Sequence, residues 1–117
     1  MDVATIVLSF IVAALMSVTG ATKLLDTSTA RRNAEHLGVG PVRNVAIGIA
    51  EISAAAGLIL GAFFFAPLGV VTAVAVIALM IGAVRYHVRA RDPLSAALPA
   101  LVTATLAVSL IVLHTLN

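Results

Sequence analysis

Four long apolar stretches occupy most of this chain, at residues 3–22, 45–65, 68–84 and 94–113. Each is close to the ~20 residues that a helix needs to cross the ~30 Å hydrocarbon core of a bilayer. Three of them contain no formally charged residue, and the second contains only Glu51. A single stretch of this kind could be a buried helix in a water-soluble protein. Four such stretches fill most of this short chain, and too little of it remains to shield them from water. The pattern therefore predicts four membrane-spanning helices.

The composition indicates the same environment. Hydrophobic residues make up 62% of the chain and charged residues 10%, whereas a soluble domain has about 25% charged residues. We therefore expect one domain over residues 1–117, an all-α, antiparallel four-helix bundle with the lipid bilayer as its solvent. The formal net charge of +2 is too small to suggest a nucleic-acid partner.

The connections between the stretches predict how the helices follow one another. Ala66-Pro67 predicts a very short turn, so the second and third spans are expected to be antiparallel neighbours. The connection over residues 23–44 is too long for a turn. It has capping residues at 27–29 and a helix stop at Gly38, which predicts a short helix lying along the membrane interface.

All seven lysine and arginine residues lie in the first and third connections. With four spans these two connections share one side of the membrane, and the opposite side has no basic residue. The positive-inside rule then predicts a multi-pass protein with both basic connections in the cytoplasm and both termini outside. The basic residues are Lys23, Arg31, Arg32 and Arg43 in the first connection and Arg85, Arg89 and Arg91 in the third.

Glu51 is the most informative residue for function. It follows the start of the second span by six residues, which at ~1.5 Å each places it about 9 Å below the cytoplasmic interface. A carboxylate at that depth is expected to face the bundle interior and to have a partner. The candidate partners, all at the cytoplasmic ends of spans, are Lys23, Arg85 and His87. These three and Glu51 form the predicted ligand-binding set.

Two interpretations of Glu51 remain open at this point. It could be a structural ion pair that fixes how the helices align, or it could take part in ligand binding or proton transfer. If the protein is an enzyme, Glu51 and His87 are the candidate catalytic residues.

Small residues form a second stripe on the same span. Ser53, Gly57 and Gly61 recur at a spacing of four, and the two glycines make a GxxxG pattern that permits close helix approach. The pattern predicts helix packing at this stripe, either inside the bundle or between two copies in a homodimer.

No metal site is expected. His36, His87 and His114 lie in different predicted elements, and the chain contains no cysteine. No phosphate-binding loop or nucleophile triad is present either.

Three segments together resemble the DoxX-like family of small bacterial membrane proteins. They are residues 48–61, which contain Glu51 and the glycine stripe, residues 20–24 at the end of the first span, and residues 87–92 after the third. The resemblance implies a four-helix bundle in the bacterial inner (plasma) membrane. It also implies that the protein can serve as the membrane partner of another, redox-active subunit. It identifies no cofactor.

Three functions are compatible with these features. The first is an accessory protein that binds an apolar small molecule of quinone or isoprenoid type, or docks a partner, through a polar cluster around Glu51. The second is an enzyme in which Glu51 is the general acid or base on a lipophilic substrate, as an isomerase, a cyclase or an epoxide-opening enzyme. The third is a purely structural or assembly subunit. The absence of Cys-x-x-Cys argues against a thiol oxidoreductase.

Overall fold

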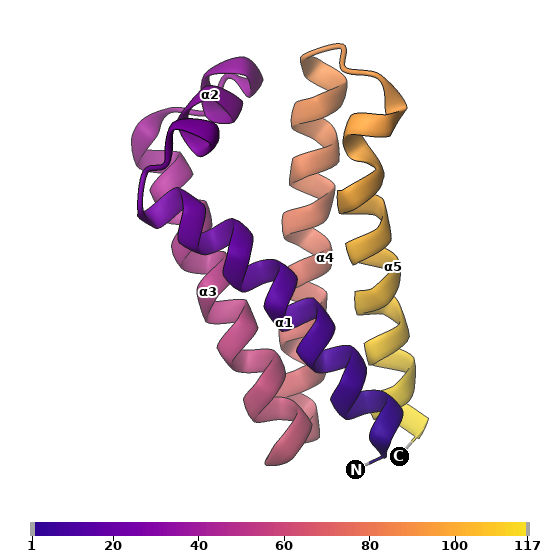
Figure 1. The fold of residues 1–117 in the computed structure, drawn as a ribbon. Helices are drawn as coiled ribbons and strands as arrows, with labels where there is room; N and C mark the ends of the chain where they lie inside the picture. The colour runs from indigo at the N-terminus through magenta and orange to yellow at the C-terminus, as the bar shows by residue number, and fades with distance from the viewer. Residues whose placement is uncertain (1, 117) are drawn as a thin grey trace.

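The chain folds into helices that pack as a bundle (Figure 1). The computed structural model describes residues 2–116, and within them there is no strand. Five helices follow one another in the order α1 (Val3–Leu24), α2 (Ser28–Leu37), α3 (Pro41–Phe63), α4 (Ala66–Arg89) and α5 (Leu94–Leu116).

Four of the helices are long and apolar enough to cross a membrane. α1, α3, α4 and α5 each have 22 to 24 residues, and the mean hydropathy of their most apolar windows is 2.0 to 2.4. The chain is therefore a multi-pass membrane protein. The predicted all-α membrane bundle is confirmed.

The predicted helix between the first two spans is also confirmed, and it is α2. Its N-cap is Thr27, whose hydroxyl oxygen accepts a hydrogen bond from the backbone N–H of Ala30 at 3.1 Å. Gly38 ends the helix with a left-handed backbone (φ 75°), a conformation in which glycine avoids the strain of a side chain. Ala30 and Ala34 are the buried residues of α2, so its small apolar face packs against the bundle.

The predicted turn at Ala66-Pro67 is wrong by two residues. The connection between α3 and α4 lies at Phe64 and Phe65, and Pro67 is in the first turn of α4. Proline has no N–H to donate and a fixed φ, and both properties suit the first turn of a helix. The helices also extend beyond the apolar stretches on the side of the basic residues, because a helix can continue where the chain leaves the hydrocarbon.

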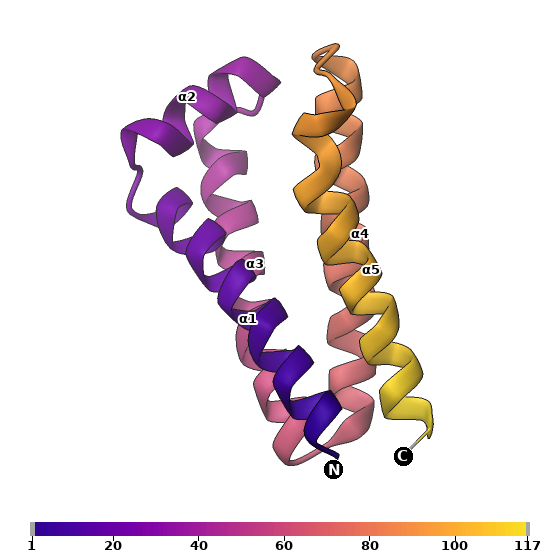
Figure 2. The ribbon, with the colours of Figure 1, turned by 45° about the vertical axis from the view of Figure 1, so that its right-hand side comes forward.

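The bundle consists of two helix pairs that meet at one end and separate at the other. α1 packs on α3, and α4 packs on α5. The pairs converge where the two termini lie and diverge toward α2 and the α4–α5 connection, as Figures 1 and 2 both show. Close approach of α3 and α4 near the converging end depends on glycine, because a Cβ at Gly61 would overlap the backbone of Gly69.

This contact generates a stability prediction. Gly61→Ala should lower the free energy of unfolding by about 1–3 kcal/mol, the usual cost of forcing extra volume into a packed interior. The matched control is Gly82→Ala on α4, because a Cβ at Gly82 meets nothing within 4 Å. The control should be neutral or stabilising by up to about 1 kcal/mol, since alanine favours helix over glycine. Unfolding of the purified protein in a denaturant series measures both variants, and equal stability of the two would contradict the packing.

Candidate functional site

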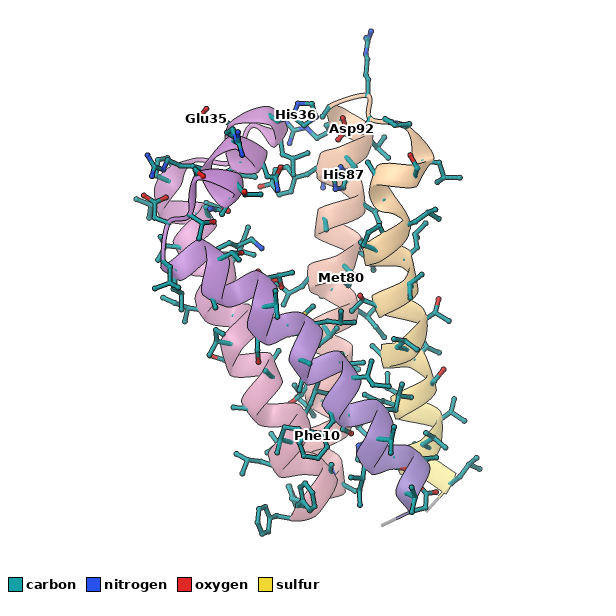
Figure 3. All side chains as sticks on the ribbon, in the orientation of Figure 1. Phe10, Glu35, His36, Met80, His87 and Asp92 are labelled. Atoms are coloured by element: carbon teal, nitrogen blue, oxygen red, sulfur yellow. The ribbon has the colours of Figure 1, made fainter. Side chains whose placement is uncertain are left out.

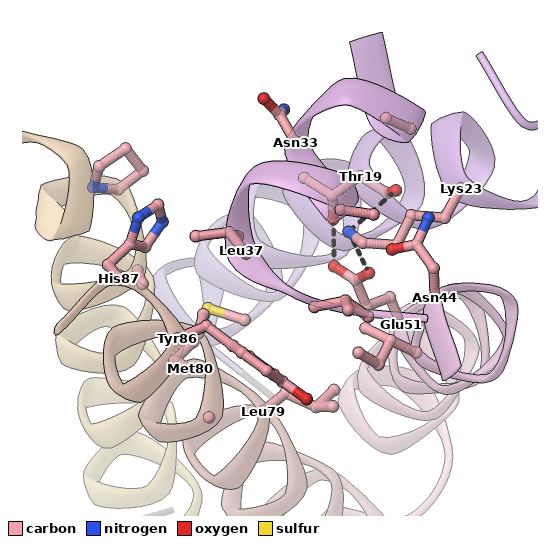
Figure 4. A pocket seen from close by; sticks show the side chains of 18 of the residues that line it. Thr19, Lys23, Asn33, Leu37, Asn44, Glu51, Leu79, Met80, Tyr86 and His87 are labelled. Atoms are coloured by element: carbon pink, nitrogen blue, oxygen red, sulfur yellow. Dashed lines mark hydrogen bonds and ion pairs between the residues drawn. The ribbon is translucent and has the colours of Figure 1, made fainter. Parts of the chain in front are cut away.

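Glu51 is buried in α3, with an exposed fraction of only 3%. Its Oε1 lies 2.7 Å from Nζ of Lys23, and its Oε2 accepts a short hydrogen bond of 2.5 Å from the hydroxyl of Thr19. Figure 4 shows both partners reaching the carboxylate from α1. Each carboxylate oxygen therefore has a polar partner.

The backbone of the two helices makes this arrangement possible. Thr19 and Lys23 are one turn apart on α1, so both side chains reach the same face of that helix. Gly20, between them, lies against Gly48 of α3, and a Cβ built on either glycine would be 2.9 to 3.0 Å from the other's carbonyl oxygen. Without side chains at these two positions α1 and α3 approach closely. The close approach places the Lys23 ammonium within reach of a carboxylate one turn deeper in α3.

A cavity of about 730 Å³ lies beside this ion pair, between the α1–α3 pair and the α4–α5 pair. Its volume is within the range of about 300–1,000 Å³ that is typical of small-molecule sites. Glu51, Lys23 and Thr19 line it on one side, and Met80 and Leu79 of α4 lie across from them (Figure 4). Most of the other lining residues are apolar, including Leu15, Met16, Leu37, Val39, Ile47, Ala78, Ala83, Pro99 and Ala100.

A carboxylate bridge joins the two halves of the molecule at the diverging end. Asp92, in the α4–α5 connection, places Oδ1 2.6 Å from Nε2 of His36 on α2 and Oδ2 2.7 Å from Nδ1 of His87 on α4. Figure 3 shows the three residues together at this end of the bundle. The hydrogen bonds from His87 and then His36 lower the pKa of Asp92 below its usual value of 3.8. His36 and His87 also line the cavity, so the bridge lies at its edge.

The predicted site residues divide between two places. Lys23, Glu51 and His87 all line the cavity, with His87 nearer the Asp92 bridge. Arg85 is not among the residues that line it and lies instead beside a second, smaller cavity.

The three residues of the predicted packing stripe, Ser53, Gly57 and Gly61, also lie on two different surfaces. Gly57 and Gly61 face α4, where a Cβ at Gly57 would meet the side chain of Thr72. Ser53 is exposed on the outer surface of α3.

Two residues of the site were not predicted. Thr19 could have been found, since it precedes Lys23 by one helical turn on the same face. Asp92 offered no such signal, because its position depends on the loop, where Arg91 adopts a positive φ of 58°. The three histidines lie on different helices, as predicted, and His114 is buried near the far end of α5, whereas His36 and His87 share Asp92. Within residues 2–116 no group of three or more His, Asp or Glu side chains is arranged to hold a metal ion.

The ion pair predicts a specific pattern in a double-mutant cycle. Lys23→Met leaves the buried carboxylate without its cation and should lower the free energy of unfolding by about 3 kcal/mol, the low end for a broken buried pair because Lys23 is 24% exposed. Adding Glu51→Gln removes the unmatched charge, so the double variant should recover most of that loss. Arg32→Met, at an exposed position on α2, is the control and should change little. If Lys23→Met and Arg32→Met are equally stable, the pair does not hold α1 to α3.

The Asp92 bridge predicts a pH dependence. The pKa of Asp92 is lower in the folded protein than its ordinary value of 3.8, so the bridge stabilises the fold above that value. The stabilisation is lost as the pH falls through the folded pKa. Asp92→Asn should therefore lower the unfolding temperature at neutral pH and have no effect at pH values well below 3.8. Asp26→Asn, at an exposed residue that pairs with Arg31 on the surface, should change little at any pH. If Asp92→Asn still lowers the unfolding temperature in acid, the loss of the carboxylate charge is not the cause of the lower stability.

Comparison with known proteins agrees with this architecture. No match was found among curated proteins or among solved structures. The model of the DoxX-like family matches residues 7–109, which is most of the chain. The matched range contains every residue that lines the cavity, as well as the Asp92 bridge. The chain therefore belongs to the DoxX-like family.

Proposed function

We propose that this protein binds an apolar small molecule with a polar head, of quinone or isoprenoid type, in the cavity between the two helix pairs. One observation carries the proposal: a cavity of about 730 Å³ with a mainly apolar lining has a buried, partnered carboxylate in its wall. Binding sites for small molecules combine an apolar lining with a few fixed polar groups in this way.

The lining suggests how such a molecule is oriented. Leu15, Met16, Leu79 and Met80 offer an apolar surface for a ring or a chain. Methionine side chains adapt to irregular shapes, so they suit a flat or flexible ligand. The polar head belongs beside Lys23, which can donate a hydrogen bond to a carbonyl or hydroxyl oxygen. The buried amide of Asn44 lies on the same lining and adds a donor and an acceptor.

The second candidate is an enzyme acting on a lipophilic substrate, as an isomerase, a cyclase or an epoxide-opening enzyme. The supporting observation is that Glu51 and His87, the candidate acid or base residues, line the same cavity, and that Asp92 fixes the ring of His87. Binding is favoured because both oxygens of Glu51 already have partners in Lys23 and Thr19. A general base needs a carboxylate oxygen that can approach the substrate proton.

We place the protein in the bacterial inner (plasma) membrane, with both termini outside. The basic residues support this orientation, because they lie at the end of the bundle that carries α2 and the α4–α5 connection, opposite the termini (Figure 1). A homodimer and a redox partner protein stay predictions. Gly57 and Gly61 pack on α4, so a dimer would require a different face from the GxxxG stripe.

Tyr86 allows a direct binding test. It is the sole tyrosine, the chain has no tryptophan, and its side chain lines the cavity. Titration of the purified protein with a short-chain ubiquinone should quench the fluorescence of Tyr86 in a saturable manner. Ala78→Phe fills the cavity and should weaken binding by about tenfold or more, equivalent to about 1.4 kcal/mol. Glu51→Gln should weaken it by a similar factor in the folded fraction, because it removes the carboxylate that holds the Lys23 ammonium in the polar wall.

The control is Ala75→Phe, at an exposed position of α4 that does not line the cavity. It adds the same side chain and should bind the quinone as the unaltered protein does. A soluble tyrosine derivative corrects for light that the quinone absorbs. Unsaturable quenching, or equal binding by the Ala78→Phe and Ala75→Phe variants, would refute the proposal. If the Glu51→Gln variant binds the quinone normally, the carboxylate is not part of the binding site.

A further inference from the structure

A second cavity lies on the outside of the bundle, where α3 begins and α4 ends. Its volume is about 270 Å³, and five residues line it: Arg43, Gly82, Arg85, Tyr86 and Arg89. Gly82, Arg85, Tyr86 and Arg89 follow one another at helical spacing on one face of α4. Arg43 comes from the first turn of α3. The cavity is thus a basic groove between two membrane-spanning helices.

The three arginines of this groove have no carboxylate partner among the described residues. The salt bridges within residues 2–116 are made by Lys23, Arg31, His36 and His87. Asp26, Glu51 and Asp92 are engaged in those pairs, and Asp2 lies at the opposite end of the bundle. Glu35, the remaining acidic residue, is exposed on α2 and forms no salt bridge with these arginines. The groove therefore concentrates three positive charges that the fold itself does not neutralise.

Arg43 and Tyr86 are held in a defined geometry. Nη1 of Arg43 donates a hydrogen bond to the hydroxyl oxygen of Tyr86 at 3.1 Å. The tyrosine keeps its own O–H to donate, so the groove offers a hydroxyl donor beside the guanidinium groups. The space next to Gly82 in the groove is free, because a Cβ at this position would meet nothing within 4 Å.

Two general effects account for part of this charge but not for its arrangement. Basic residues are common at cytoplasmic helix ends, and they favour the negative end of the helix dipole. Both effects apply to Arg85 and Arg89 in the last turns of α4. Neither explains why Arg43, in the first turn of a different helix, is held over the same groove by Tyr86.

The depth of the groove in the membrane indicates the ligand. Arg85 directly follows the apolar stretch 68–84, and Arg43 comes just before the stretch 45–65, so the groove is level with the head groups of one leaflet. Guanidinium groups bind phosphate oxygens through paired hydrogen bonds. Basic pockets between membrane helices are suited to anionic lipid head groups. The volume holds a phosphate group with several waters, since each water takes about 30 Å³.

We propose that Arg43, Arg85, Tyr86 and Arg89 bind the phosphate of an anionic phospholipid at the membrane surface. The lipid's acyl chains lie along the outer faces of α3 and α4, and its head group occupies the groove. Lipid binding here needs no ligand in the larger cavity, although Arg43, Gly82 and Tyr86 line both cavities.

The test counts phospholipids bound to the detergent-purified protein by native mass spectrometry, during titration with phosphatidylglycerol or with phosphatidylcholine. Phosphatidylglycerol should bind at one saturable site, and phosphatidylcholine should not. Replacing Arg43, Arg85 and Arg89 together by Gln should weaken that binding by about tenfold or more. Gly82→Phe, which fills the groove and changes no charge, should weaken it comparably.

The control replaces Arg31, Arg32 and Arg91 together by Gln, which removes the same charge from the same end of the molecule. It should bind phosphatidylglycerol within about twofold of the unaltered protein, because none of these three arginines lines the groove. Equal losses in the two triple variants would overturn the proposal in favour of a diffuse basic surface. Displacement of the lipid by millimolar inorganic phosphate would show a site for free phosphate instead.

Discussion

A buried carboxylate is costly without polar partners, and the burial of Glu51 inside the bundle is the constraint on which the rest of the structure depends. Its burial requires polar partners, and α1 provides both of them with Lys23 and Thr19. They reach Glu51 because the glycines at positions 20 and 48 let the two backbones approach. The pair α1–α3 is thus defined by an electrostatic requirement as well as by apolar packing.

The cavity follows from how the two helix pairs are joined. At the end that carries the termini, Gly61 lies against Gly69 and brings α3 close to α4. At the other end α2 lies over the α1–α3 pair and reaches the α4–α5 pair through His36, which contacts Asp92. A bundle that is closed at one end by glycine contacts and spaced at the other by an extra helix is wedge-shaped. Glu51 lies in the wall of this wedge and gives the cavity a strongly polar wall.

The sequence predicts the spans, α2 and a partner for Glu51 among Lys23, Arg85 and His87, because these depend on local hydropathy, capping and depth. It does not predict which surface the GxxxG stripe contacts, since glycine spacing is the same for a neighbouring helix and for a second copy. Asp92 was also beyond prediction. Its contact with His36 joins residues 56 positions apart, and it depends on how the two helix pairs diverge. Arg85 was grouped with Glu51 by depth alone, but depth does not specify the face of a helix, and Arg85 faces the other cavity.

Tyr86 connects the two proposed sites. Its side chain lines the large cavity, and its hydroxyl accepts a hydrogen bond from Arg43 in the basic groove. Arg43 and Gly82 also line both cavities. A phosphate that binds the other N–H groups of Arg43 would fix the guanidinium that Tyr86 contacts, and with it a ring in the wall of the large cavity. Linkage makes such an effect reciprocal: a molecule that fixes Tyr86 from the large cavity changes lipid affinity at the groove by the same factor. In this proposal the bilayer is the solvent for the four spans and also supplies a ligand whose head group is coupled to the larger cavity through Tyr86.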